Sequence, residues 1–436
     1  MAPGTARDCS AVSTAPAPPS PVSATGSPAE PIRAGARRAP AVAALLVAWN
    51  LRAAIVAISP LLPEIRRSTG MSSTMAGLLT TLPLVCFGLF AFVAPALHRR
   101  AGQDVLLATV LAVLAAGILV RLAPGLPALF AGTTLAGAAI AVGNVTLPVT
   151  VRQCYPGRVA LVTGLVAVGV SGGAALASGL TIPIAHAFAL GWRPALAVWA
   201  IPAVAALAAV GWTVRPRRAP APTPVPAPVL LPSPPAGVPG PPSGARQGTA
   251  RRARQALLPA GALPLTAFMG LQSLDFYATA AWLPTVFQSH GVSASASGWL
   301  VSLASLVSIP ASLGAPLLAA RSRRSAWLVA AVAACGAGLV GIALDPAGPA
   351  AAYASVLGVG QGATFALALG AIATRATSHE SVARLSSVVQ GGGYLVAALG
   401  PVAIGALHAL SGGWTLPLAV LVALLVPEAL AGILTG

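Results

Sequence analysis

Hydrophobic residues in this chain gather into long runs that recur from about residue 40 to the C-terminus, and short stretches with arginine, proline or glycine separate them. A helix needs about 20 predominantly apolar residues to cross the hydrocarbon core of a bilayer. The runs therefore predict an all-α polytopic membrane protein with twelve transmembrane helices. The helices are expected at residues 40–62, 73–97, 104–122, 127–149, 159–186, 193–213, 259–287, 295–319, 325–344, 350–373, 383–408 and 414–435.

Two stretches lack this apolar pattern and divide the chain into four parts. Residues 1–39 are rich in Pro, Ala and Ser without a hydrophobic signal-peptide core, which predicts a disordered N-terminal tail. Residues 214–258 are crowded with proline and hold seven arginines and no acidic residue. Backbone of this kind cannot sit in lipid, so we expect a cytoplasmic linker between an N-terminal half, 40–213, and a C-terminal half, 259–436.

The two halves resemble each other in sequence. A shift of 221 residues, and of 222 near the end of each half, superimposes several residues without a gap. The matched pairs include Gly70 with Gly291, Ser72 with Ser293, Gly77 with Gly298, His186 with His408 and Trp192 with Trp414. Two six-helix pseudo-repeats in parallel arrangement are typical of transporters that hold their substrate near the bilayer midplane, between the halves.

Composition excludes an ordinary soluble protein. Of the 436 residues, 56% are hydrophobic and only 8% are charged, and the mean hydropathy is +0.85. A soluble domain could not bury that much apolar surface. The four cysteines lie far apart and form no CxxC pair, so the sequence indicates neither a disulfide framework nor a metal site, and we expect no cofactor.

The charge distribution predicts an orientation in the membrane. All 25 basic residues are arginine, and twenty of them fall on the side of the predicted topology that holds both termini and the linker. Only Arg66, Arg67, Arg121 and Arg193 fall in loops on the other side. Cytoplasmic loops carry the excess of basic residues, so both termini should face the cytoplasm from the inner membrane. The net charge of +17 comes without a soluble basic face, and we expect no nucleic-acid partner.

Two ionisable residues lie deep in predicted spans, where a charge is costly and marks a functional candidate. Arg52 lies in the predicted first helix, within Trp49-Asn50-Leu51-Arg52. Asp275 is the only acid near the middle of a predicted helix. The first and seventh helices are repeat mates that should face each other across the cavity. Asp275 is therefore expected either to pair with Arg52 or to carry a proton during transport.

Neutral polar residues form a second group of candidates for substrate contact. They lie on the predicted first, fourth, seventh, tenth and eleventh helices, and each could instead serve only helix packing. The residues are Asn50, Asn144, Gln272, Tyr277, Gln361, Gln390 and Tyr394.

Several short motifs resemble one family of transporters. These are Asn50 to Ala54, Pro60 to Ile65, Ala76 to Pro83, Gly143 to Arg152, Gly270 to Ser273 with Trp282 to Pro284, and Leu385 to Trp414. Together they resemble the cyanate permease and 2-nitroimidazole transporter family of the major facilitator superfamily, over about residues 40–435.

The resemblance implies a permease for a small anionic or weakly polar solute, with Asn50 and Arg52 entering the cavity. Asp275 stands where the family leads us to expect an uncharged residue. The loop from Pro95 to Gly102 resembles a degenerate form of the superfamily's cytoplasmic gating motif, which implies gating contacts by Arg99, Arg100 and Gly102.

The sequence thus predicts a secondary transporter that works as a monomer in the lipid bilayer, by alternating access, on a small solute and with protons as one coupling alternative. An exporter of amphipathic drugs is the nearest rival; the fifth helix lacks the Gly-Pro of an antiporter signature. A receptor or scaffold without transport is a rival from another class. An enzyme is disfavoured because no nucleophile–base or metal constellation emerges.

Overall fold

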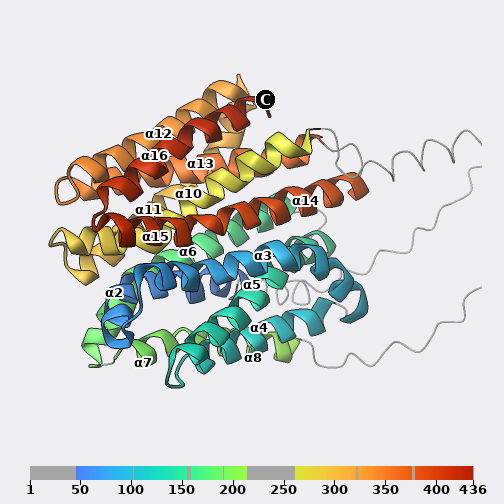
Figure 1. The fold of residues 1–436 in the computed structure, drawn as a ribbon. Coiled ribbons are helices and arrows are strands. Elements are labelled where there is room, and N and C mark those ends of the chain that lie inside the picture. The colour runs from blue at the N-terminus through green and yellow to red at the C-terminus, as the bar shows by residue number, and fades with distance from the viewer. Residues whose placement is uncertain are drawn as a thin grey trace, which may run out of the picture.

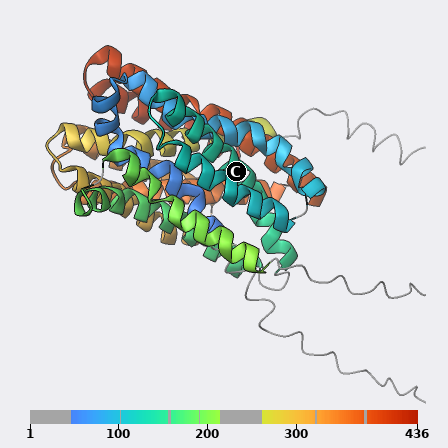
Figure 2. The same cartoon turned by 90° about the horizontal axis from the view of Figure 1, so that it is seen from below.

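The computed structural model describes residues 46–101, 103–154, 159–189, 191–213, 261–320, 323–375 and 379–435. The expected tail, 1–39, and the expected linker, 214–258, lie outside these residues. The described chain is helical throughout apart from turns and short irregular segments, and its helices lie roughly along one common direction (Figures 1 and 2).

The helices follow one another in the order that the apolar runs predict. The first span is Leu46–Thr69, with a turn at Ala57 and α2, Ile58–Thr69, as its second part. The N-terminal half continues with α3 Ser73–Ala101, α4 Gln103–Val120, α5 Leu126–Cys154, α6 Val159–Ala187, α7 Trp192–Ala197 and α8 Ala200–Thr213. The C-terminal half holds α10 Ala262–Ser289, α11 Ala294–Ala319, α12 Arg324–Leu344, α13 Ala350–Arg375, α14 His379–Ala397, α15 Leu399–Ser411 and α16 Thr415–Ile433.

These elements make twelve passes within the described residues. Ten spans are long and apolar enough to cross a membrane, with α7 and α8 forming one and α14 and α15 another. The other two passes are α4, a shorter apolar helix, and α10, which has 28 residues and carries polar side chains in its middle. Large exposed apolar side chains, such as Phe92 at 54% and Leu317 at 68%, suit a surface that faces lipid and not water.

Several helix ends differ from the sequence prediction, among them the end of α5, which lies at Cys154 instead of residue 149. The first span extends to Thr69, seven residues beyond the predicted end, because Pro63 is tolerated inside α2 and Gly70 ends it in a left-handed conformation with φ of 69°. Likewise, α3 continues to Ala101. The stretch Pro95 to Ala101, expected in a loop, is therefore helical; basic residues are favourable in the last turn of a helix because they offset its dipole.

The internal repeat is visible in local geometry. Gly70 and Gly291, which are repeat mates, both adopt positive φ, 69° and 86°. Their neighbours Ser72 and Ser293 accept hydrogen bonds from the backbone N–H three residues on, each at 3.2 Å. The two halves thus begin their second helix with the same glycine turn and serine cap.

The halves meet along two pairs of helices that the repeat relates. The ribbon shows α3 beside α14 and α15, and α6 beside α11 (Figure 1). In the first pair a Cβ on Gly77 would lie 2.5 Å from the Pro401 carbonyl oxygen, and in the second a Cβ on Gly298 would lie 2.4 Å from that of Ser178. Glycine at these mates lets the backbones of the two halves approach closely.

Candidate functional site

Arg52 points from the first span toward α10 and lies half-buried between the halves. The Cζ atom of its guanidinium lies 4.4 Å from the centroid of the Phe276 ring and 5.8 Å from that of Tyr277. A guanidinium over an aromatic face is attracted by the ring quadrupole, by about 0.5–2 kcal/mol depending on how far the charge is desolvated. Two aromatic rings of the C-terminal half therefore cover this cation.

Asp275 lies on the other side of α10 and meets α13. Its side chain is 3% exposed, and its Oδ2 accepts a hydrogen bond of 3.0 Å from Nε2 of Gln361. The same Nε2 donates to Oγ1 of Thr279 at 2.9 Å. Thr279 follows Asp275 by one helical turn, so both residues present their side chains on one face of α10.

The ion pair that the sequence allowed between Arg52 and Asp275 is not formed: within the described residues, Asp275 has no ion-pair partner and its Oδ1 has no hydrogen-bond partner. The reason is the direction of the side chains. Phe276 and Tyr277 of α10 face Arg52, whereas Asp275 faces Gln361. Gln361 takes the place beside Asp275 that Arg52 was expected to hold.

A pocket opens between the first span, α10, α11 and α13. Most of its wall is apolar, with Val56, Phe276, Leu283, Phe287 and Leu300 among the lining residues. The polar part of the lining comes from Thr279, Gln361, Ser305 and Ser308. Phe276 belongs both to this pocket and to the cover over Arg52, and Gln361 joins the pocket to Asp275.

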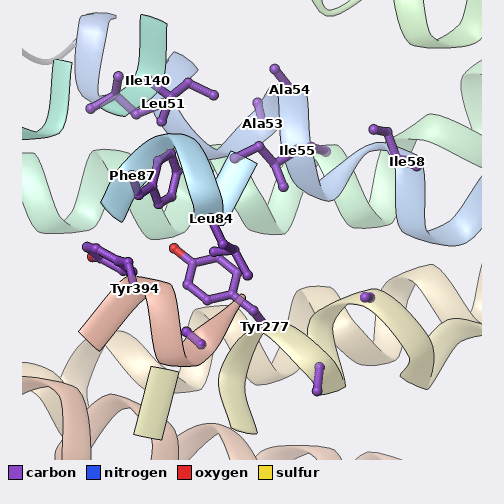
Figure 3. Close-up of a cluster of buried hydrophobic side chains, with 14 of the residues drawn as sticks. Leu51, Ala53, Ala54, Ile55, Ile58, Leu84, Phe87, Ile140, Tyr277 and Tyr394 are labelled. Atoms are coloured by element: carbon purple, nitrogen blue, oxygen red, sulfur yellow. The ribbon is translucent and has the colours of Figure 1, made fainter. Parts of the chain in front are cut away.

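Three aromatic rings close the space between the halves next to this site. The Phe87 ring of α3 lies edge-on to Tyr394 of α14, with centroids 5.3 Å apart, and to Tyr277, 6.3 Å apart. Tyr277 and Tyr394 are 6.4 Å apart. Figure 3 shows both tyrosines reaching from the C-terminal half toward Phe87 and Leu84. Edge-to-face contacts of this kind contribute about 0.5–1.5 kcal/mol each beyond burial.

Two predicted site residues are packed within their own half. Asn50 is 2% exposed, and its Nδ2 donates to the carbonyl oxygens of Leu46 and Pro202, at 2.7 and 3.2 Å. Gln272 is 3% exposed and donates to the Met269 carbonyl oxygen at 3.1 Å and to Ser273 Oγ. Neither amide takes part in the contacts around Arg52 or Asp275.

The remaining predicted residues are less buried. Asn144 on α5 and Gln390 on α14 are half-buried, and Gln390 donates to Ser386 Oγ at 2.6 Å. Arg100 is exposed in the last turn of α3. The side chain of Arg99 and the whole of Gly102 lie outside the described part of the chain.

One residue expected in an outer loop is instead buried. Arg121 is 1% exposed, and its Nη1 donates to the carbonyl oxygen of Ala54, close to the turn of the first span, at 2.8 Å. Gly132 gives the arginine room, since a Cβ there would lie 2.8 Å from Arg121 Cγ. Arg121 lies at the end of a predicted helix, where the sequence suggested a loop. No periodic pattern of residues indicated that its side chain points inward.

Asp275 is not the only acid buried within a helix of the C-terminal half. Glu428 lies within α16 and is 1% exposed. The signal was present in the sequence, because Glu428 interrupts an otherwise apolar run of nineteen residues, and an acid in such a run is a functional candidate. Among the described residues no group of His, Cys, Asp and Glu is arranged to hold a metal ion.

Comparison with known proteins gives a consistent result. The profile of the Major Facilitator Superfamily matches residues 41–271 and 265–435. The chain is 33% identical over 400 residues to the 2-nitroimidazole transporter of Escherichia coli (strain K12), covering 90% of this chain and 94% of that protein. It is 34% identical over 392 residues to the uncharacterized transporter YycB of Bacillus subtilis (strain 168), covering 89% and 91%. The cyanate transport protein CynX of Escherichia coli (strain K12) is 29% identical over 371 residues, covering 85% and 90%.

Solved structures share the fold at low sequence identity. A bacterial homologue of the human lysosomal transporter Spinster, inward-facing and unoccupied, superimposes with a TM-score of 0.71 at 16% identity, covering 92% of this chain and 97% of that one. A D-xylose–proton symporter superimposes with a TM-score of 0.64 at 13% identity, covering 90% and 96%.

Proposed function

Because the chain belongs to the major facilitator superfamily and its relatives are transporters, we propose that it moves a small, flat, weakly polar solute of the nitroimidazole type across the cytoplasmic membrane. The solute would bind between the two six-helix halves, which alternately open the site to either side. The observation that carries this proposal is the shared position of Phe276, which lines the apolar pocket and covers Arg52.

The lining of the pocket supports a heterocyclic solute. Phe276, Phe287 and Leu300 offer apolar and aromatic surface to a flat ring. The amide of Gln361 and the hydroxyls of Thr279 and Ser305 offer hydrogen bonds at a few positions. A pocket with an apolar wall and few polar groups is the usual form of a site for a small organic molecule.

The same lining disfavours a bare anion such as cyanate. Moving an ion out of water into an apolar pocket is costly unless a counter-charge and hydrogen bonds meet it there. Arg52 lies against Phe276 of the pocket wall, but the rings of Phe276 and Tyr277 cover it in this conformation. We propose that Arg52 instead donates hydrogen bonds to the nitro group of a neutral solute when Phe276 turns aside.

Binding to the purified protein tests this assignment. The thermal unfolding midpoint should rise with 2-nitroimidazole and should change much less with sodium cyanate at equal concentration, because a ligand that binds only the folded state stabilises it. The rise should disappear in Arg52→Ala. Stabilisation by cyanate alone would overturn the choice of solute in favour of an anion.

Export of amphipathic compounds is a second candidate, and the aromatic pocket favours it. The two candidates differ in direction and in breadth of substrate. Cells that express the protein should accumulate 2-nitroimidazole faster than control cells if it is an importer, whereas an exporter would lower accumulation of several unrelated amphipathic dyes. A dye-resistant phenotype without nitroimidazole uptake would replace our proposal by this rival.

A further inference from the structure

Arg121 is an arginine buried inside the N-terminal half, directly after α4. Its Nη1 donates to the Ala54 carbonyl oxygen at 2.8 Å, while its Nε and Nη2 have no hydrogen-bond partner among the described residues. A single bond to a neutral carbonyl group offsets little of the cost of burying a charge. An apolar residue would therefore serve the stability of the fold at least as well at this position.

The carbonyl group that Arg121 binds lies next to an interruption of the first span. A turn at Ala57 breaks the helix three residues after Ala54, and Figure 3 shows Ala54 in this part of the span. Pro60 accounts for the break, because a proline has no N–H to donate and its ring clashes with the carbonyl group four residues earlier. In the C-terminal half the same place in the repeat is Ala281, and α10 continues through it. The last carbonyl groups before a break lack partners within the helix, and Arg121 supplies a donor to one of them.

The shift of 221 residues also relates the packing around Arg121 to that of the C-terminal half. Gly117 on α4 corresponds to Gly338 on α12. A Cβ on Gly117 would lie 2.7 Å from the backbone N of Ala136, and one on Gly338 would lie 2.8 Å from that of Leu357. Ala136 and Leu357 are themselves repeat mates, so the two halves pack these helices in the same register.

In this register the C-terminal half lacks the buried arginine. The mate of Arg121 is Ile342, which is buried and apolar. The mate of Gly132, which gives Arg121 its space, is Tyr353, whose ring packs on Gly341. The proline break, the arginine and the glycine beside it thus occur together in one half and are replaced together in the other. This joint occurrence indicates that the arginine serves the break.

We propose that Arg121 is a positioning residue for Arg52, which lies two residues before Ala54 on the same helical segment. A helix that is broken by proline can bend at the break, so its parts are directed by their contacts with neighbouring helices. Arg121 holds the segment from the N-terminal half, whereas Arg52 reaches from it to the Phe276 ring of the other half. The consequence for solute binding rests on the proposed function, but the direction of Arg52 does not.

Thiol labelling tests the direction of residue 52 without any solute. In a background without the four native cysteines, Arg52→Cys is labelled with a maleimide, alone and together with Arg121→Met, which removes the donor and keeps an unbranched apolar chain. The labelling rate should change several-fold with Arg121→Met and should return toward its original value with Arg121→Lys, whose ammonium group can still donate to Ala54. Arg121→Gln, which is too short to reach the carbonyl oxygen, replaces Arg121→Met if that variant does not fold.

The matched control is Ser355→Cys, a half-buried position on α13. Its labelling rate should be the same with each residue at position 121. An unchanged rate at residue 52 would overturn the positioning role. Equal changes at residues 52 and 355 would mean a general loosening of the fold and would overturn it as well.

A double-mutant cycle tests whether Arg121 acts on the solute through Arg52. Isothermal titration calorimetry should show that Arg121→Met raises the dissociation constant for 2-nitroimidazole by about tenfold, which corresponds to about 1.4 kcal/mol. In an Arg52→Ala background the same change should have little further effect, because coupled residues are not additive. Arg193→Gln, which changes a half-buried arginine stacked on Trp192, should bind as wild type does.

The outcomes of the cycle separate the two proposals. The same tenfold loss in both backgrounds would mean that Arg121 acts independently of Arg52 and would overturn the positioning role. Absence of any binding by wild type would instead refute the proposed solute and leave the labelling result standing.

Discussion

At the scale of single residues, Arg52 is held by aromatic rings and not by an acid. A contact with the ring faces does not use the N–H groups of the guanidinium, whereas an ion pair with Asp275 would have occupied them. The acid is held by Gln361 instead. Arg52 and Asp275 therefore take part in separate contacts, one with the rings of α10 and one with α13.

Phe276 should be needed for binding as much as Arg52. Phe276→Ala removes a wall of the pocket and the cover over Arg52, so we expect the dissociation constant for 2-nitroimidazole to rise by about tenfold or more, since loss of about 1.4 kcal/mol is tenfold. Phe188→Ala, an exposed phenylalanine before α7, is the matched control and should bind as wild type does. Isothermal titration calorimetry measures the dissociation constant of both variants. Equal affinities would show that Phe276 does not contribute to the binding site.

Gln361 should stabilise the fold through Asp275. Gln361→Leu leaves Asp275 without its hydrogen bond and should cost about 1–3 kcal/mol, the penalty of an unsatisfied buried group. Gln390→Leu, which breaks a half-buried bond to Ser386, should cost less. Thermal unfolding in detergent compares the two variants, and an unchanged midpoint for Gln361→Leu would contradict this role.

Two contacts of single residues could not be predicted from the sequence. Asn50 and Arg52 were expected in the same cavity, yet two residues along a helix turn by about 200°, so their side chains point to nearly opposite sides. Asn50 consequently bonds to Pro202 in its own half. The hydrogen bond from Gln361 to Asp275 joins residues 86 positions apart. No local pattern in the sequence predicts such a contact.

At the scale of helices, glycine decides which elements approach closely. On α13, a Cβ on Gly358 would lie 2.2 Å from the Ala304 carbonyl oxygen, and one on Gly362 would lie 2.3 Å from that of Ser308. The backbones of α11 and α13 thus pack directly against each other and form part of the pocket wall.

Gly358→Ala should therefore destabilise the C-terminal half. The added methyl group meets backbone that cannot move aside, so we expect a loss of about 1–3 kcal/mol, as in other overpacked interiors. Gly314→Ala on α11 has open space around it and should be neutral or slightly stabilising, because alanine favours helix. The thermal unfolding midpoints of the two variants test this prediction. Equal midpoints would contradict the close packing of α11 and α13.

The number and order of helices could be predicted because apolar length is a direct signal for a membrane span. The ends were harder to predict. Pro63 and the two arginines after it resembled a loop, but proline is tolerated in membrane helices whose neighbours satisfy the freed carbonyl groups. The inward turn of Arg121 depends on the space beside Gly132, which only the packed structure contains.

At the scale of the whole molecule, the two halves are joined by contacts that a transport cycle would have to break. Gln288 of the C-terminal half donates to the Pro60 carbonyl oxygen of the N-terminal half at 3.3 Å. This bond lies at the end of the bundle with the Gly70 and Gly291 turns. Opening the site to that side requires α2 and α10 to separate there.

Bridging this contact should stop transport reversibly. In a background without the four native cysteines, Pro60→Cys with Gln288→Cys is treated with a short cleavable cross-linker. Uptake should fall to the level of protein-free liposomes and return on reduction, and each single-cysteine variant should be unaffected. Undiminished uptake by the bridged protein would mean that the halves do not separate at this end.

The central claim is that the protein carries a nitroimidazole-type solute through a site containing Arg52. Uptake of radiolabelled 2-nitroimidazole into proteoliposomes with purified protein tests it most directly. We predict uptake by wild type well above protein-free liposomes and a decrease of about 10–100-fold in Arg52→Ala, because a charge-assisted hydrogen bond contributes about 1.5–3 kcal/mol. Equal uptake by wild type and Arg52→Ala, or none by wild type, would contradict the account.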